Sequence, residues 1–243
     1  MLDEGVLDEL VEISHRTADL GLVVAGEGNV SARSTEGDTF WIKRSGCELG
    51  RVSGEDFVEV DLDQAAGDIS KAGDAVITRS KEDHRASIEA AIHACIYHNQ
   101  PDSNFVIHTH SPYALAGCCT EDVRGFFRPQ FPDSVVYLGS PESNWVFLEY
   151  VHPGEGIARE LMNSLERGMH DLRVVILANH GVITVGKTAN EAMARSDMLE
   201  KRSLVRIMSS IAGSPTLLTE DAIGYLDEWE SEKYRQRVMR GDI

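Results

Sequence analysis

The sequence Phe105-Val106-Ile107-His108-Thr109-His110 is the stretch from which the rest of the chain can be interpreted. Three apolar residues followed by His-X-His are typical of a buried strand with two imidazoles at its end. Because side chains alternate along a strand, we expect His108 and His110 on the same face. On a helix the two side chains would point about 200° apart. An imidazole pair on one face suits a metal ion, although two hydrogen-bonded surface histidines give the same pattern.

The composition is that of a globular protein. The chain has 243 residues, of which 42% are hydrophobic and 26% charged, so it can bury a sizeable core. No Pro/Gly/Ser-rich linker, low-complexity run or internal repeat divides the sequence. We therefore expect a single domain over residues 1–243, with a helical tail from about residue 217.

The formal net charge of −17 argues against nucleic acid or an anionic membrane as a partner. A phosphate surface requires a basic protein surface, because binding depends on the release of counterions. A small anionic substrate needs only a local cluster of cationic side chains. Candidates in the first half of the chain are Lys43, Arg44, Arg79, Lys81 and Arg85.

The cysteines and the N-terminus favour a cytoplasmic protein. Cys47, Cys95, Cys118 and Cys119 show neither CxxC spacing nor the density of a disulfide framework. The N-terminus lacks the basic and apolar regions of a signal peptide, and no apolar run reaches about 18 residues. We expect no membrane association.

The first third of the chain predicts one helix and several strands. Residues 3–22 place apolar side chains on one helical stripe, with acidic residues in the first turn. Residues 26–33 and 39–43 predict two strands joined by a polar turn, and residues 57–61 predict another strand. A hairpin region with Gly and Asp follows, up to Gly73.

A Ser-Gly pair follows the second predicted strand, within Lys43-Arg44-Ser45-Gly46-Cys47. Such a pair can present a hydroxyl and bare backbone N–H groups to an anion. An ordinary turn has the same sequence, so both interpretations stay open.

A helix is predicted over residues 85–99, just before the His108 strand. Within it Glu89, His93 and Tyr97 recur every four residues, on a polar face beside the apolar one. A carboxylate among apolar neighbours must reach solvent or find a partner, and an antiparallel return of the chain would bring Glu89 beside His108. His93 and Tyr97 can equally be packed side chains with one hydrogen bond each.

The second half predicts further helices, then two strands that meet at a histidine. After a turn that contains Pro112, an Ala-rich apolar helix is expected through about Cys118, and another helix over residues 154–168. Residues 173–178 and 182–185 are apolar strands separated by Asn179-His180-Gly181. A Thr-x-x-Glu capping box at Thr188 opens a helix from Ala189 to about Ile211.

Four side chains that can bind a metal or transfer a proton therefore lie at the ends of predicted strands or on the helix just before one. His108, His110 and His180 each follow an apolar strand, and Glu89 lies on the helix that leads into the first strand. Three imidazoles and one carboxylate are a credible set for a divalent transition metal that leaves room for substrate.

At these positions the chain resembles the class II aldolase/adducin family, over about residues 5–211. Each motif alone is weak, but their order and spacing are specific as a set. The motifs are Gly26-Glu27-Gly28-Asn29-Val30-Ser31, Ser45-Gly46, Ser87-Ile88-Glu89 with His93, His108-Thr109-His110 and Asn179-His180-Gly181.

The resemblance implies a three-layer α/β/α fold with a central, mostly antiparallel sheet. It implies Zn²⁺, or another divalent transition metal, held by His108, His110 and His180, with Glu89 as the catalytic acid/base. It also implies a homotetramer with sites at subunit interfaces. Substrate phosphate would bind at the N-terminal loops, where the matching positions are Gly28, Asn29, Ser45, Gly46 and Ser87.

The chain departs from the family pattern in three places. It has Ser87-Ile88 where family aldolases commonly have Ser-Ser, which removes one hydroxyl donor to phosphate. It has Lys43-Arg44 in place of the usual Thr-Pro, and two cations there could restore an anion site. Residues 127–131 offer no tyrosine to protonate the leaving aldehyde.

The function implied is a zinc-dependent aldolase that acts on a ketose or ketose phosphate through a metal-bound enediolate. Dehydration, epimerisation and decarboxylation can follow from the same intermediate. Glu89 favours an aldolase or dehydratase, since related pentulose-phosphate 4-epimerases tend to carry Asp there. A non-enzymatic, adducin-like interaction domain would keep the fold without the metal, and the complete set of three histidines and Glu89 argues against it.

Overall fold

The structure, a computed structural model, describes residues 3–67, 77–79, 84–229, 233–234 and 237–238. Among these residues, eight strands form one sheet in the order β4-β3-β2-β1-β5-β8-β7-β6. All neighbouring strands are antiparallel except β6 and β7. The strands are β1 (Asn29–Arg33), β2 (Thr39–Lys43), β3 (Phe57–Asp61), β4 (Ile77–Arg79), β5 (Phe105–Thr109), β6 (Trp145–Leu148), β7 (Val174–Leu177) and β8 (Gly181–Gly186).

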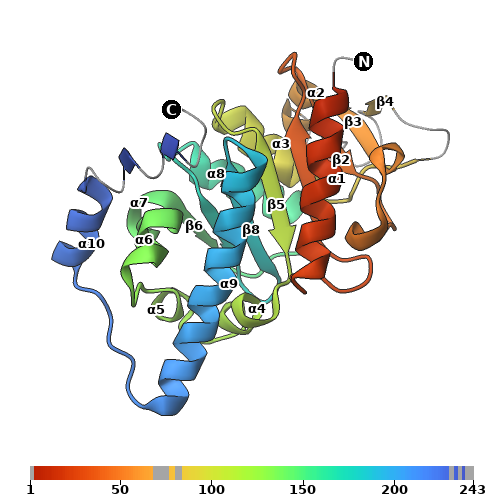
Figure 1. Cartoon of the computed structure of the whole chain (residues 1–243). Coiled ribbons are helices and arrows are strands. Elements are labelled where there is room, and N and C mark those ends of the chain that lie inside the picture. Colours follow the sequence, from red (N-terminus) through yellow and green to blue (C-terminus); the bar gives the residue numbers. More distant parts are fainter. Residues whose placement is uncertain (1–2, 68–76, 80–83, 230–232, 235–236, 239–243) are drawn as a thin grey trace.

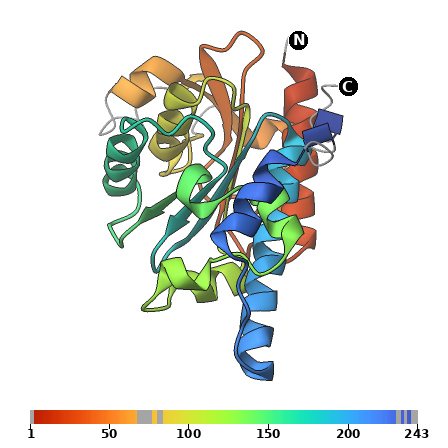
Figure 2. The ribbon, with the colours of Figure 1, turned by 90° about the vertical axis from the view of Figure 1, so that its left-hand side faces the viewer.

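Helices cover both faces of the sheet, which lies between them in Figure 2. The long helices α1 (Glu4–Asp19) and α9 (Ala189–Ala212) cross one face (Figure 1), and the other is covered by α2 (Leu62–Gly67), α3 (Ala90–Asn99) and α8 (Glu155–Leu165). The remaining elements are α4 (Pro112–Cys118), α5 (Val123–Phe126), α6 (Pro132–Leu138), α7 (Pro141–Asn144), α10 (Glu220–Glu228) and the 3₁₀ turns η1 (Leu49–Arg51) and η2 (Gly54–Asp56). No helix in the described ranges is long and apolar enough to cross a membrane.

The strand β5 shows how the sheet divides the core. Phe105 and Ile107 pack into the cluster that contains α1 and α9, whereas Val106 packs into the cluster under α3 and α8. This alternation follows from the two-residue period of a strand. It turns His108 toward the face covered by α3, where the side chain is 1% exposed.

The helix predicted over residues 85–99 is shorter than expected, because α3 has Glu89 as its N-cap residue. Residues 85–87 pair instead with residues 43–45, through an isolated bridge and two backbone hydrogen bonds. Ile88, an apolar residue within the range of the predicted helix, is 68% exposed. The apolar spacing alone could not show this, since the competing partner lies far away in the sequence.

The region between α4 and α8 also differs from the expectation. The strand β6 was not predicted, and it supplies the parallel pair of the sheet with β7. Residues 124–133, for which the sequence predicted no helix, contain most of α5. Farther on, the tail helix α10 packs Ile223 and Leu226 against Val135 of α6, so the tail docks on its own chain.

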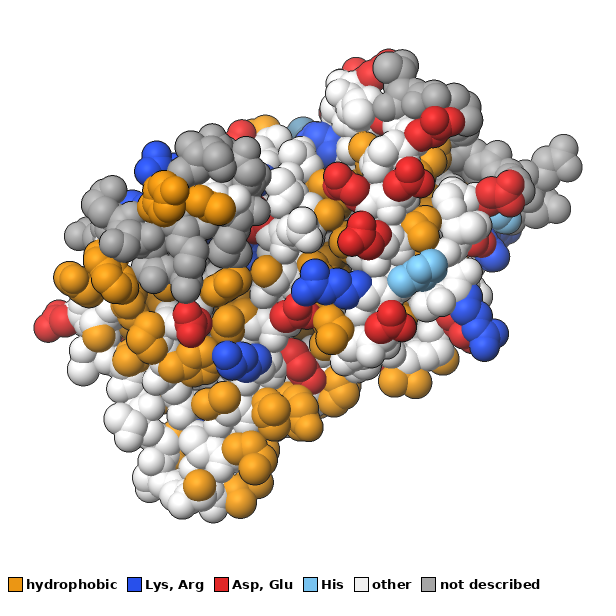
Figure 3. Space-filling view, viewed as in Figure 1, with side chains coloured by type: hydrophobic (Ala, Val, Ile, Leu, Met, Phe, Trp, Pro, Cys, Tyr) orange, Lys and Arg blue, Asp and Glu red, His pale blue; other side chains and the backbone are white. Residues whose placement is uncertain are grey.

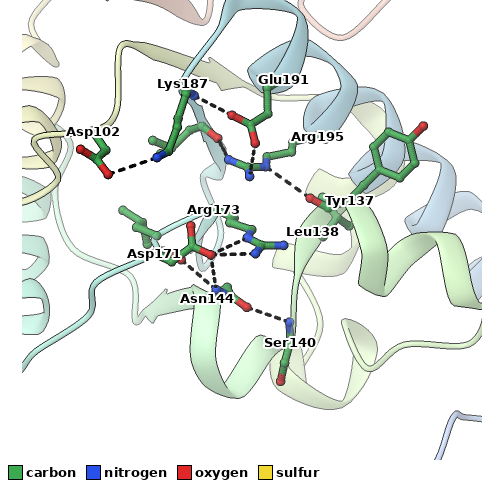
Figure 4. Close-up of polar contacts among 12 residues, drawn as sticks. Asp102, Tyr137, Leu138, Ser140, Asn144, Asp171, Arg173, Lys187, Glu191 and Arg195 are labelled. Carbon is green, nitrogen blue, oxygen red and sulfur yellow. Dashed lines mark hydrogen bonds and ion pairs between the residues drawn. The ribbon is translucent and has the colours of Figure 1, made fainter. Parts of the chain in front are cut away.

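The N-terminus of α9 is fixed by a polar network (Figure 4). As predicted, the Thr188 hydroxyl accepts from the Glu191 backbone N–H, and the Glu191 carboxylate accepts from the Lys187 backbone N–H. The guanidinium of Arg195 lies 2.7 Å from the Glu191 carboxylate, and both side chains are 6% exposed. Arg195 also donates to the backbone carbonyls of Tyr137 and Val185. One buried cation therefore ties α9 to α6 and to β8.

The substitution Arg195→Ala should lower the free energy of unfolding by about 3–5 kcal/mol, because it removes the guanidinium from a buried carboxylate. Urea unfolding at neutral pH measures this change. Lys187→Ala is the matched control: its ammonium pairs with Asp102 at the surface, so the loss should stay below about 1 kcal/mol. Equal losses in the two variants would contradict the structural role given to Arg195.

Candidate metal centre

Three imidazoles converge at one end of the central strands. His108 lies near the end of β5, His110 follows that strand, and His180 lies in the turn that joins β7 to β8. One ring nitrogen from each lies within 4.8 Å of the other two. The ring centroids are 4.9–5.1 Å apart, with the planes steeply inclined to one another. The structure thus brings together the three histidines predicted as metal ligands.

The hydrogen bonds of two of these rings leave Nε2 facing the centre. Nδ1 of His108 lies 3.0 Å from the carbonyl oxygen of Val182, and Nδ1 of His110 lies 3.1 Å from Oε2 of Glu27. A carbonyl only accepts, so His108 carries its proton on Nδ1 and has a lone pair on Nε2. Such outer partners of ligating imidazoles are a regular feature of metal sites.

The spacing of the nitrogens also fits a metal ion. Nε2 of His108 and Nε2 of His110 lie 3.1 Å apart. Two lone pairs that face each other at this distance require a cation or a proton between them. Nitrogens on a tetrahedral zinc, bound at about 2.0–2.1 Å, lie about 3.3 Å apart. The donor set and its spacing therefore fit a divalent metal.

The Glu89 carboxylate closes the fourth side of this cluster. Its Oε2 lies 3.2 Å from Nε2 of His108, and its Oε1 lies 3.3 Å from Nε2 of His180. The amide of Asn29 donates to Oε2 at 2.8 Å. Burial is the largest influence on the pKa of Glu89 and acts to raise it, but the two imidazoles and the Asn29 hydrogen bond together hold that pKa below its ordinary value. The carboxylate is therefore ionised at neutral pH.

Burial favours the neutral form of two of the imidazoles, His108 and His180. It lowers the pKa of His108, and it lowers the pKa of His180 to about 4. Only a neutral imidazole has a free lone pair for a metal, so these two rings can act as ligands at neutral pH without first losing protons.

Two glycines allow the segments of the site to approach each other. A Cβ on Gly181 would lie 2.6 Å from the carbonyl oxygen of Thr109 and 2.7 Å from Cδ2 of His110. A Cβ on Gly28 would lie 2.8 Å from the carbonyl oxygen of His108, and Gly28 has a φ of +67°. Any side chain at either position would push apart the strands that carry the imidazoles.

The positions matched to phosphate binding lie close to one another. Ser45 and Gly46 form an exposed turn, with Gly46 at a φ of +79°. The segment before this turn pairs with residues 85–87, so the largely buried Ser87 lies beside it. The Ser87 hydroxyl accepts from the backbone N–H of Glu89 at 3.4 Å. Residues 87–89 therefore connect the turn to the metal centre, because Ser87 lies beside the turn and Glu89 faces the imidazoles.

The cations of this region have partners within the protein. The Lys43 ammonium donates to the carbonyl oxygens of Gly26, at 2.9 Å, and Cys47, at 2.7 Å. Arg44 pairs with Asp56 at 2.7 Å. In the arrangement described, Lys43 and Arg44, the two cations that could restore an anion site, are thus engaged by groups of the protein itself. Among the other cations proposed, Lys81 lies outside the described residues.

Behind Glu89 lies a buried hydrogen-bonded chain that sequence analysis did not assign. The Ser31 hydroxyl lies 2.6 Å from Nδ1 of His93 and 2.7 Å from the Tyr97 hydroxyl, which donates to the carbonyl oxygen of Asn104 at 3.4 Å. Burial lowers the pKa of His93 to about 3. His93 and Tyr97 are thus part of one network rather than separate packed side chains, and Ser31, on β1, was the missing partner.

In metal-free protein, stability should decrease as the pH falls below about 6.5. Unfolded chain binds a proton at His93 near that pH, whereas the folded chain binds it only near pH 3, so acid favours the unfolded state. His93→Gln should reduce the slope of the free energy of unfolding between pH 7 and pH 5, measured by urea unfolding in the presence of a chelator. The control is His98→Gln, which removes an exposed imidazole of the same helix; a slope in His93→Gln as steep as in this control would contradict the assignment.

Comparison with known proteins gives the same family that the sequence motifs indicated. The family model described as Class II Aldolase and Adducin N-terminal domain matches residues 8–207. The chain belongs to the class II aldolase/adducin family. Class II aldolases use a divalent metal, and the three histidines supply a site that could hold one.

Several curated relatives match most of the chain. The L-fuculose phosphate aldolase of Methanococcus maripaludis (strain C7) is 29% identical over 195 residues, which are 80% of this chain and 92% of that protein. The 5-deoxy-D-ribulose 1-phosphate aldolase of Bacillus thuringiensis serovar kurstaki is 27% identical over 221 residues, 91% of this chain and 93% of that protein. The 3-oxo-tetronate 4-phosphate decarboxylase of Haemophilus influenzae is 28% identical over 204 residues, 83% and 86% of the two chains.

Solved structures show the same fold. YgbL from Klebsiella pneumoniae superposes with a TM-score of 0.76 at 22% identity and covers 93% of this chain and 99% of that chain. The L-fuculose 1-phosphate aldolase from Glaciozyma antarctica PI12 has a TM-score of 0.71 at 21% identity, with 97% and 88% covered. The predicted α/β fold with a mostly antiparallel sheet is therefore confirmed.

Proposed function

We propose that this protein is a zinc-dependent aldolase that cleaves or forms a carbon–carbon bond in a ketose or ketose phosphate. The observation that carries the proposal is the convergence of His108, His110 and His180 beside the buried carboxylate of Glu89. Relatives named as sugar-phosphate aldolases support a small-molecule substrate of this class.

The three imidazoles would hold the metal, and Glu89 would move the proton. A divalent metal at this site supplies a Lewis acid that stabilises negative charge on substrate oxygen by several kcal/mol, so no Schiff-base lysine is needed. The ionised Glu89 carboxylate accepts the proton released from substrate and returns it later in the reaction. Asn29 fixes the direction of this carboxylate through its amide N–H, at 2.8 Å from Oε2. Burial of Glu89 keeps bulk water away from the transferred proton.

Substrate phosphate would bind at the exposed turn next to this centre. We assign this role to Ser45, Gly46 and Ser87, since the turn offers a hydroxyl and exposed backbone and lies beside Ser87. Gly28 contributes by its close approach to β5. One N–H of Asn29 is already used by Glu89, so we give Asn29 a positioning role in place of direct phosphate binding.

We also propose that the protein is a cytoplasmic homotetramer. Hydrophobic side chains gather at the lower end of the molecule in Figure 3. There the second half of α9 exposes Met208 and Ile211 at 54% and 75%. A face of this kind is suited to a contact between subunits. If light scattering gave the mass of a monomer, the proposal of a tetramer with sites at its subunit interfaces would be wrong.

Decarboxylation is a second candidate, because one relative is named a 3-oxo-tetronate 4-phosphate decarboxylase and residues 127–131 contain no tyrosine for the leaving aldehyde. Dehydration and epimerisation need the same kind of centre. An assay of phosphorylated and free ketoses and 3-oxo acids, with aldehyde and CO₂ measured separately, distinguishes these reactions.

The substitution His110→Ala should remove the metal and the activity together, since two imidazoles bind zinc poorly. Elemental analysis should give close to one zinc per chain for the unaltered protein and little for the variant, with turnover reduced at least about 100-fold. His152→Ala, at an exposed position, should change neither. Unaltered protein that takes up no zinc when it is supplied would rule out the proposed function.

The substitution Glu89→Gln should separate chemistry from metal binding. The amide cannot accept the proton, so we expect kcat to fall about 10²–10⁴-fold. Zinc content should stay near that of the unaltered protein, because the three imidazoles remain. Turnover within about threefold of the unaltered enzyme would show that another group carries the proton.

A further inference from the structure

The Glu27 carboxylate contacts one of the three imidazoles directly. Its Oε2 lies 3.1 Å from Nδ1 of His110, and its Oε1 accepts from the backbone N–H of Val24 at 2.6 Å. The two side chains are only partly exposed, 31% for Glu27 and 22% for His110. Glu27 lies between Gly26 and Gly28, and the family resemblance assigned it no role in the site.

The segment that carries Glu27 is held on both sides. The carbonyl of Gly26 accepts from the buried Lys43 ammonium at 2.9 Å. Gly28 packs against the His108 backbone so closely that a Cβ would lie 2.8 Å from its carbonyl oxygen. The carboxylate is therefore placed by the fold, in contrast to a surface side chain that samples many rotamers.

We infer that Glu27 is a positioning residue for the metal centre: its carboxylate holds the proton of His110 on Nδ1 and thereby directs Nε2 at the cation. This inference rests on the proposed function, since it concerns the same metal site. A carboxylate behind a ligating imidazole fixes its tautomer and ring orientation and makes the nitrogen a better donor.

Because of Glu27, two of the imidazoles have hydrogen-bond partners of different charge. His108 has a neutral carbonyl, that of Val182, behind its ring, whereas His110 has a full negative charge behind its ring. The same short segment reaches the acid–base group, because Asn29 donates to Glu89. Residues 26–29 thus orient both the ligand His110 and the acid–base residue Glu89. The property that Glu27 controls is the affinity of the site for a divalent cation.

Metal affinity of the full-length chain tests the inference, by competition of Zn²⁺ and of Co²⁺ against a chromophoric chelator at pH 8. Glu27→Ala should bind each ion about 10–100-fold more weakly than the unaltered protein. Glu27→Gln should lie between the two, because its amide oxygen can accept from only one of the two donors. Glu160→Gln removes an exposed charge of α8 and is the matched control, expected to stay within about twofold.

A second readout uses the metal-free protein and needs no activity. In ¹⁵N NMR spectra of the histidine side chains, His110 of the unaltered chain should be protonated on Nδ1, and Glu27→Gln should shift the population toward the Nε2-protonated tautomer. Thermal unfolding of each apo variant checks that the fold is retained. If Glu27→Ala does not fold, Glu27→Gln carries the comparison alone.

The inference is overturned if folded Glu27 variants bind metal within twofold of the unaltered protein, or if Glu160→Gln weakens binding as much as they do. An unchanged His110 tautomer in Glu27→Gln would overturn it as well. Failure of the proposed function has a different signature: the unaltered chain would then bind no metal, while the tautomer measurement would still report on the contact between Glu27 and His110.

Discussion

The pairing of β5 with β1 on one side and β8 on the other is the constraint on which the metal centre depends. His108 lies across from Asn29 on β1 and from Ile183 on β8. This register places the Asn29 amide beside the Glu89 carboxylate and brings the turn that carries His180 next to β5. A shift of one residue would turn His108 to the opposite face of the sheet, toward α1 and α9. The same backbone hydrogen bonds that stabilise the sheet therefore also fix the positions of the ligands.

The second feature of the centre is a group of polar side chains inside an apolar layer. Buried polar atoms are costly unless they are hydrogen-bonded or neutral. The protein meets this requirement in two ways. The imidazoles stay uncharged, because burial lowers the pKa of His108, His180 and His93. The carboxylate of Glu89 keeps its charge, because the amide N–H of Asn29 donates to it. If a divalent cation occupied this site, the carboxylates of Glu89 and Glu27 would lie near it and help to balance its charge.

Most of the layout could be predicted from local patterns. The alternation in β5, the apolar runs of β7 and β8 around His180 and the capping box of α9 are all signals carried by neighbouring residues. The predictions that were wrong concern segments whose structure depends on contacts with residues far away in the sequence. Residues 85–87 carry a helical pattern but pair with residues 43–45, and β6 is a four-residue strand whose partner, β7, comes much later in the chain. The roles of Glu27 and Gly181 likewise depend on segments that only the folded chain brings together.

The close packing of Gly181 against Thr109 and His110 has a consequence for how the protein assembles. In the unfolded chain only the local His108-Thr109-His110 pair can meet a cation, and the third imidazole arrives when β8 docks on β5. Such a non-local pairing requires the closure of a long loop, which is slow. Three imidazoles held together in the native state would bind a divalent cation far better than the two neighbouring imidazoles of the unfolded chain. At a free concentration 100 times its Kd, this difference adds about 2.7 kcal/mol to the stability of the native state. Supply of such a metal would thus affect the stability of the folded chain.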